Sequence, residues 1–173
     1  MKHKGYHQSQ FIKQPDVVML YTYTNVGMDE RYYARNFDYY EKMCECSSSL
    51  SYAPHAIACI DNDRLLSFYD YLKRTAEIDL KNLHGGSEDG VHSGCAAGVW
   101  YSVFRGLFGC VCGEDEIRLN PKRLPWWKNV RMKFFYKGSL INLELCGKMI
   151  SVSKQGGHSA KISIYGKEYL LKR

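Results

Sequence analysis

The chain has 173 residues, of which 45% are hydrophobic, and its formal net charge is +6 at pH 7. This length suits one domain or two small ones, and the hydrophobic fraction is sufficient for a packed core, which argues against a disordered chain. No apolar run approaches the length of a membrane span, and the first residues lack the apolar segment of a secretory signal, so we expect no membrane partner.

Apolar residues recur with helical spacing through the first two thirds of the chain. In the clearest stripe, Leu65, Tyr69, Leu72 and Ala76 are followed by Leu80, and turn residues come directly after it. The pattern predicts five helices, over residues 17–23, 31–42, 52–60, 65–80 and 91–108.

Short alternating segments separated by glycines follow. They predict strands over residues 116–119, 130–136, 140–145, 149–152, 161–165 and 168–171. The charge changes at the same place, since residues 1–112 contain 11 Lys and Arg against 13 Asp and Glu, whereas residues 113–173 contain 13 against 5. We therefore expect an α+β chain with two domains, residues 1–112 and 113–173.

The basic second domain raises the possibility of a nucleic-acid partner. Its basic residues Arg131, Lys133 and Lys137 mostly alternate with apolar residues, as on the solvent face of a half-buried strand. Lysines at such positions also discourage edge pairing. The pattern therefore favours a strand that binds no nucleic acid.

Seven cysteines are scattered through the chain, at positions 44, 46, 59, 95, 110, 112 and 146. A chain of this size needs no disulfide scaffold, so we expect reduced thiols in a cytoplasmic protein. Cys44 and Cys46, like Cys110 and Cys112, are separated by one residue, whereas zinc-binding pairs are usually separated by two or more, and no pair of histidines follows. The sequence therefore predicts no metal site.

The stretch from Gly85 to Trp100 has the composition of a helix start. It contains two glycines, an expected N-cap at Ser87, acids in the predicted first turn, His92 and several small residues. Free N–H groups and the helix dipole favour an anion at such a start, and His92 would add a donor. The alternative is a glycine-rich turn with a capped helix that packs closely through its small residues.

Three polar clusters lie in connections and at helix starts: Lys13 with Gln14, residues 47–51, and residues 85–92. Such positions indicate one end of a helical layer and a shared pocket for a phosphate or a sugar. Each cluster also has a structural interpretation. Lys13 would be a solvated end, Ser48 and Ser49 would cap the helix at 52–60, and His55 would be a hydrogen-bonded core histidine.

The same clusters resemble glycoside hydrolase family 65, the inverting α-glucoside phosphorylases of the maltose, trehalose, kojibiose and nigerose type. The similar segments occur in register over most of the chain, at residues 11–18, 35–41, 48–51 with His55, 88–92, 97–100, 119–127 and 134–138. The resemblance implies that the helices are the last helices of an (α/α)6-barrel catalytic domain. The strands would be a small antiparallel β-sheet or sandwich domain. Family members are several times longer than this chain.

The chemistry implied by the resemblance is attack of inorganic phosphate on the anomeric carbon of an α-glucoside, which gives β-glucose 1-phosphate. Phosphate, a co-substrate, replaces the water and base of an inverting hydrolase, so one carboxylic acid suffices and no cofactor is implied. By similarity, Ser48, Ser49 and His92 would bind phosphate, and Lys13 and Gln14 would contact the glucosyl unit.

The family's general acid is a Glu from an earlier part of the barrel, and no motif here matches its surroundings. Glu88 and Asp89 are poor substitutes, because an ionised carboxylate in a helix's first turn is stabilised, which opposes the raised pKa of a general acid. Their expected role is dipole compensation and loop anchoring. We therefore expect no catalytic residue in this chain.

Two interpretations remain open: a fragment that is inactive alone, and a non-catalytic carbohydrate-binding or complementing subunit of a split phosphorylase. The partner would be a second copy in a homodimer or the missing barrel half. Cys46 and Ser47 stand where family members commonly have His and then Asp or Gly, and Pro15 replaces a common Ala. A decayed or repurposed site and the choice of disaccharide are also open.

Overall fold

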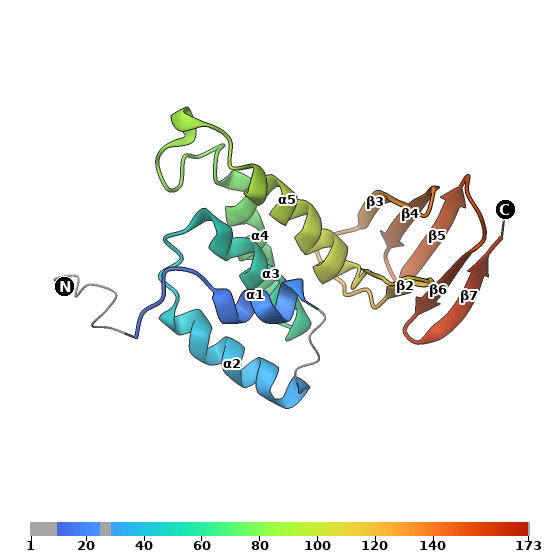
Figure 1. Ribbon diagram of the computed structural model, residues 1–173, viewed down its shortest axis with the longest axis horizontal. Coiled ribbons are helices and arrows are strands. Elements are labelled where there is room, and N and C mark those ends of the chain that lie inside the picture. Colours follow the sequence, from blue (N-terminus) through green and yellow to red (C-terminus); the bar gives the residue numbers. More distant parts are fainter. Residues whose placement is uncertain (1–9, 25–28, 173) are drawn as a thin grey trace. The chain divides into compact units, whose positions relative to one another are not determined.

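The computed structural model describes residues 10–24 and 29–172. The chain divides into two compact units, residues 1–103 and 104–173 (Figure 1). Within its described part, the first unit contains the helices α1 (Asp16–Tyr23), α2 (Glu30–Met43), α3 (Tyr52–Asp61), α4 (Leu65–Glu77) and α5 (Ser93–Tyr101). The predicted order of helices followed by a small β-domain is confirmed.

The core of the first unit is built around α3. Every residue of α3 from Tyr52 to Ile60 is buried, as expected of a helix that is apolar on all sides. α1, α4 and α5 all contact it. Phe37 from α2 and Phe68 from α4 are among the largest fully buried side chains.

Short irregular turns precede two of these helices. The 3₁₀ turn η2 (Ser49–Ser51) leads directly into α3, and the 3₁₀ turn η3 (Ser87–Asp89) lies in the connection before α5. α5 continues into a π-helical segment, η4 (Ser102–Leu107), where the Ser102 hydroxyl donates to the Gly98 carbonyl over 2.7 Å. The one continuous helix predicted over residues 91–108 is therefore two segments.

The predicted helix start at Ser87 is wrong. Ser87 belongs to η3, Gly90 follows with φ of 143°, and α5 begins only at Ser93, after His92 as its N-cap. Residues with a side chain rarely adopt such a φ, which is not helical. Gly90 therefore interrupts the backbone between η3 and α5. The α4 helix also ends earlier than the stripe predicts, at Glu77, and Leu80 is 84% exposed.

The second unit contains two sheets. One has the order β1 (Val111–Cys112), β2 (Glu116–Leu119), β6 (Ala160–Ile164) and β7 (Lys167–Leu171). The other is an antiparallel meander of β3 (Asn129–Tyr136), β4 (Ser139–Cys146) and β5 (Met149–Gln155). β2 and β6 pair in parallel, while the other pairs are antiparallel. The sequence predicts β2 to β7 within a few residues but misses the short β1.

β3 shows the expected alternation between the two faces of a sheet. Met132, Phe134 and Tyr136 are buried, and Arg131 and Lys133, which precede Met132 and Phe134, are exposed. The basic residues thus occupy the solvent face of a half-buried strand, as predicted. Among the described helices of the chain, none has the length and apolar character needed to cross a membrane.

Candidate functional site

Lys13 and Gln14 lie in the segment that precedes α1 and runs beside the end of α2. The Ile12 N–H donates to the Met43 carbonyl over 2.9 Å, and the Glu45 N–H donates to the Ile12 carbonyl over 3.0 Å. This short parallel bridge places the Lys13 carbonyl 4.0 Å from the Cys44 sulfur. The Lys13 side chain is exposed and that of Gln14 is half-buried.

Ser48 and Ser49 form the turn that leads into α3. Ser48 is the N-cap of η2, where its Oγ accepts from the Leu50 N–H over 3.4 Å and its carbonyl accepts from the Ser51 N–H over 3.0 Å. Ser48 therefore caps η2, whereas the N-cap of α3 is Ser51, without a side-chain hydrogen bond. The prediction that Ser48 and Ser49 cap the helix at 52–60 is wrong, because η2 lies between Ser48 and α3. Both serines are half-buried.

His92 is held by Asp79, which follows the end of α4. Its Nδ1 lies 2.5 Å from one Asp79 oxygen, and its backbone N–H donates to the other over 2.8 Å. The hydrogen bond from His92 lowers the pKa of the Asp79 carboxyl, which is therefore an acceptor at neutral pH. Nδ1 must then carry the proton, and Nε2 is left to face another group. Nothing in the sequence pattern marks Asp79 as the partner of His92.

The loop between α4 and α5 is further tied by polar side chains. The Ser87 hydroxyl lies 3.5 Å from Asp79, and the Ser87 N–H donates to the Asn82 side chain over 3.1 Å. Asp79 and Asn82 therefore stabilise the conformation of the loop that precedes His92.

The structure brings the serine turn against the start of α5. The Cys95 thiol donates to the Ser49 carbonyl over 3.3 Å, and the Leu50 side chain reaches Gly94 in the first turn of α5. The serine turn and the start of α5 are thus in contact through the side chains of Cys95 and Leu50. Lys13 and Gln14 join the same region through Cys44, although within residues 10–24 and 29–172 their side chains make no hydrogen bond to Ser48, Ser49 or His92.

The first turn of α5 offers fewer free donors than its sequence suggests. The Ser93 N–H already donates to the Val91 carbonyl, and the Cys95 N–H to the His92 carbonyl. Glu88 and Asp89 are exposed residues of η3 and lie outside α5, so the predicted dipole compensation within its first turn is wrong. An anion here would depend on side chains more than on the helix end.

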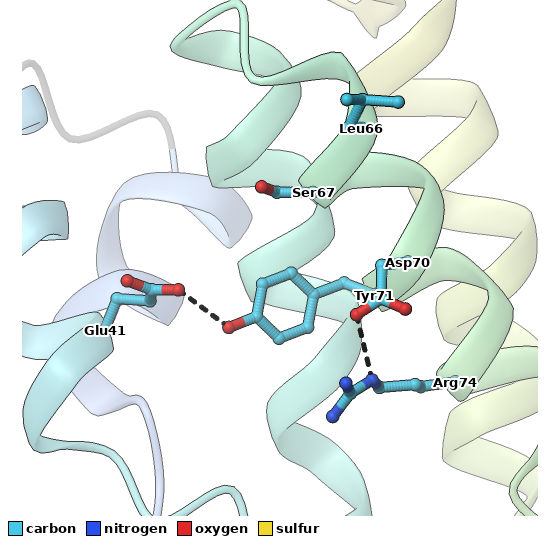
Figure 2. A pocket seen from close by; sticks show the side chains of 6 residues that line it. All are labelled: Glu41, Leu66, Ser67, Asp70, Tyr71 and Arg74. Carbon is cyan, nitrogen blue, oxygen red and sulfur yellow. Dashed lines mark hydrogen bonds and ion pairs between the residues drawn. The ribbon is translucent and has the colours of Figure 1, made fainter.

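A cavity of about 350 Å³ lies between α2 and α4 (Figure 2). Tyr71 points from α4 toward Glu41 on α2, and its hydroxyl donates to the Glu41 carboxylate over 2.9 Å. Arg74 pairs with Asp70 over 3.0 Å on the same wall. Burial raises the pKa of Tyr71, so its hydroxyl keeps its proton. None of the five predicted site residues lines this cavity. Its lining comes from two helices that are far apart in the sequence, so no motif in the sequence indicates the cavity.

Two half-buried cysteines lie near the buried His55. The Cys46 thiol donates to the Cys44 sulfur, which lowers the pKa of Cys44 to about 6 and raises that of Cys46. His55 is fully buried, and burial lowers its pKa. Its Nδ1 lies 2.6 Å from the Ser51 carbonyl, whereas its Nε2 has no partner in the described part of the chain. His55 is therefore a core histidine with one ring nitrogen unsatisfied.

Two protein-family models match consecutive parts of the sequence. The model described as the glycosyl hydrolase family 65 central catalytic domain matches residues 1–101, and that of the family's C-terminal domain matches residues 112–171. A solved structure named as a kojibiose phosphorylase from the human microbiome superposes with a TM-score of 0.86. It covers 96% of this chain and 24% of that chain at 23% sequence identity, which supports the fold alone.

Several curated phosphorylases are similar in sequence. The 3-O-alpha-D-glucosyl-L-rhamnose phosphorylase of Lachnoclostridium phytofermentans is 44% identical over 170 residues, which are 98% of this chain and 22% of that protein. The kojibiose phosphorylase of Caldanaerobacter subterraneus is 33% identical over 94% of this chain and 21% of that protein. The alpha,alpha-trehalose phosphorylase of Geobacillus stearothermophilus is 30% identical over 95% of this chain and 22% of that protein. The chain spans about a fifth of the length of these relatives.

Proposed function

Because the chain belongs to glycosyl hydrolase family 65, we propose that it is the C-terminal part of an inverting α-glucoside phosphorylase. Residues 1–112 would belong to the (α/α)6-barrel catalytic domain, and residues 113–173 would form the C-terminal β-domain. The observation that carries the proposal is the match of two successive domain models of one family along the chain, together with relatives that are disaccharide phosphorylases. Such a protein would act in the cytoplasm on an α-glucoside and phosphate.

In the proposed reaction, a phosphate oxygen attacks the anomeric carbon while an acid protonates the departing glycosidic oxygen. Configuration inverts, and the products are β-glucose 1-phosphate and the released acceptor. Hydrogen-bond donors hold the phosphate under the sugar ring and offset its charge. We assign that role to Ser48, Ser49 and His92, and contacts with the glucosyl unit to Lys13 and Gln14.

The contacts between the serine turn and the start of α5 support this assignment. The Ser49 carbonyl accepts from the Cys95 thiol, so the serine turn stays beside the helix that His92 caps. Asp79 occupies Nδ1 of His92, and the His92 side chain is 30% exposed, so Nε2 can reach a ligand. In the proposed site one phosphate would accept from both hydroxyls, and from Nε2 when both ring nitrogens of His92 carry protons.

The general acid would come from a part of the barrel outside this chain. Glu88 and Asp89 are exposed and precede α5, where nothing buries them to raise the pKa of either carboxyl group. The relatives' greater length is consistent with an acid supplied elsewhere. We therefore propose that the 173-residue chain alone has little or no phosphorylase activity.

A complementing subunit is the second candidate, and exposed apolar side chains favour it. Leu66 is 75% exposed, Leu80 84% and Val91 81%, all in the helical unit. A segment packed on the helical unit would cover such side chains. The covering partner would be the missing barrel half or a second copy of the chain.

Activity measurements test this proposal. The purified chain should release no glucose 1-phosphate from maltose, trehalose, kojibiose, nigerose or 3-O-α-D-glucosyl-L-rhamnose in the presence of phosphate. Co-expression with the preceding part of the Lachnoclostridium relative should restore phosphate-dependent release from at least one of these substrates. Robust turnover by the chain alone would contradict the proposal.

Phosphate binding provides a test that needs no activity. We expect phosphate to shift the NMR signals of the His92 ring and of the Ser48 and Ser49 amides, and the replacement His92→Ala to weaken binding about tenfold or more, since it removes a hydrogen bond to a charged ligand. His158→Ala, which removes an exposed histidine of the other unit, is the control and should leave the affinity unchanged. Equal affinity in the His92 and His158 variants would remove His92 from the site.

A further inference from the structure

Cys44, Cys46 and His55 come together although the sequence predicts no metal site at these cysteines. One sulfur from each cysteine and one ring nitrogen of His55 all lie within 4.8 Å of one another. The two sulfurs are 3.8 Å apart. Among the described residues, no other group of three or more His, Cys, Asp or Glu side chains has its ligand atoms at that spacing.

The separation of the two sulfurs matches a tetrahedral metal centre. With Zn–S bonds of about 2.3 Å and tetrahedral angles, two thiolates on one zinc ion lie about 3.8 Å apart. The sulfur-to-nitrogen separation in the same centre is about 3.6 Å. The ligand atoms of the group already lie within 4.8 Å of one another, so a sulfur and a ring nitrogen would have to approach by at most about 1 Å.

His55 has the tautomer that a metal ligand requires. The Ser51 carbonyl, 2.6 Å from Nδ1, can only accept a hydrogen bond, so Nδ1 carries the proton. Nε2 then presents a lone pair, and it is a buried atom without a partner. Metal-bound histidines commonly donate their other ring N–H to a backbone carbonyl, which fixes the ring orientation. A bound metal would satisfy this otherwise unsatisfied nitrogen.

The three ligand residues are positioned by different parts of the backbone. The bridge to Ile12 anchors Cys44, and Cys46 adopts a φ of 49°, a conformation that is uncommon for residues other than glycine. His55 lies in α3, whose residues from Tyr52 to Ile60 are all buried. The backbone at Cys44 and the histidine are therefore both held in place.

We propose that Cys44, Cys46 and His55 bind a zinc ion, with water in the fourth position. Two thiolates neutralise the dication, and the imidazole binds as a neutral ligand, which limits the electrostatic cost of a half-buried site. Thiolate and imidazole ligands suit zinc, whereas magnesium and calcium require oxygen ligands. The ion takes no part in the proposed phosphorolysis. It fastens the loop that precedes Ser48 and Ser49 to α3.

Zinc binding by the full chain, kept reduced with a phosphine, tests the proposal. We expect one zinc ion per chain after dialysis and a rise in the melting temperature on the order of 5 °C when zinc exceeds its dissociation constant a hundredfold. Cobalt in place of zinc should give sulfur-to-metal charge-transfer bands. In NMR spectra, metal should shift Nε2 of His55 while Nδ1 keeps its proton.

Two cysteine variants make the experiment specific. Cys46→Ser changes a half-buried loop residue and should weaken zinc binding about a hundredfold or more. Cys112→Ser is the matched control, because Cys110 and Cys112 share the one-residue spacing but lie in no such three-residue group, and it should bind zinc as the parent does. Unchanged binding in Cys46→Ser, binding that is lost in Cys112→Ser, or a reduced chain that retains no zinc would each overturn the proposal.

Discussion

Gly98→Val should destabilise the helical unit by about 3 kcal/mol or more, although valine is a better helix residue than glycine. A Cβ at Gly98 would lie 2.7 Å from the Cβ of Ala53 in α3 and 3.5 Å from a methyl group of Thr75 in α4. Gly98, Ala53 and Thr75 are all buried. Because the close neighbours belong to packed helices, the added methyl groups force α5 away from α3 and α4.

Urea unfolding followed by far-UV circular dichroism measures this effect. Ala97→Val is the matched control, because it adds the same β-branched side chain at the exposed neighbouring position and should cost about 0.5 kcal/mol. Gly98→Ala should also be destabilising. A higher midpoint for Gly98→Ala, as helix propensity alone predicts, would contradict the close approach of α5 to α3.

Replacing Asp79 by Ala should weaken phosphate binding about tenfold or more without removing any group that touches the phosphate. Asp79 accepts from Nδ1 and from the backbone N–H of His92, and it lies near the Ser87 hydroxyl. Without it, the His92 ring loses the partner that fixes its orientation. In metal sites, loss of such a supporting partner costs about 10- to 100-fold in affinity. Asp79 is thus a positioning residue in the proposed site.

The pH dependence of binding separates positioning from a general structural effect. The pKa of Asp79 in the folded chain lies below its ordinary value, so its stabilising contact is complete above that ordinary value and is lost as the pH falls through the lowered one. In the unmodified chain, the phosphate affinity should therefore fall in acid, as Asp79 becomes protonated and releases His92. In Asp79→Ala the affinity should show no fall of this origin.

Asp89→Asn is the control for Asp79→Ala. It neutralises an exposed acid of the same loop and should leave both the affinity and its pH profile unchanged. Phosphate titrations followed by the NMR signals of His92 provide both readouts. The positioning role would be excluded if Asp79→Ala and Asp89→Asn bound phosphate equally well.

Local pattern was sufficient to predict most elements but not their irregular boundaries. α1 to α4 and β2 to β7 follow directly from apolar periodicity and glycine spacing. The start of α5 could not be predicted in this way, because it depends on the positive φ of Gly90 and on the hydrogen bonds that His92 makes to Asp79. The parallel pairing of β2 with β6 is equally non-local, since more than 40 residues separate its partners, Ile117 and Ile162.

The candidate site shows the same division between local and non-local information. The polar clusters were recognisable as sequence, and the structure joins the segments that carry them through the Ile12–Cys44 bridge and the hydrogen bond from the Cys95 thiol to the Ser49 carbonyl. The support of His92 by Asp79 and the grouping of His55 with two cysteines were not predictable. Each requires knowing how α3 and the α4–α5 loop pack, which no spacing in the sequence encodes.

The burial of α3 from Tyr52 to Ile60 has a consequence for the serine turn joined to it. Amide hydrogens in a helix enclosed on all sides exchange with solvent only when much of the surrounding unit opens, so α3 should be among the slowest-exchanging segments. η2 continues directly into this helix, and Ser51 is itself fully buried. The hydroxyl groups of Ser48 and Ser49 are therefore attached to an element that opens late, so the anion binding proposed for them would cost little conformational entropy.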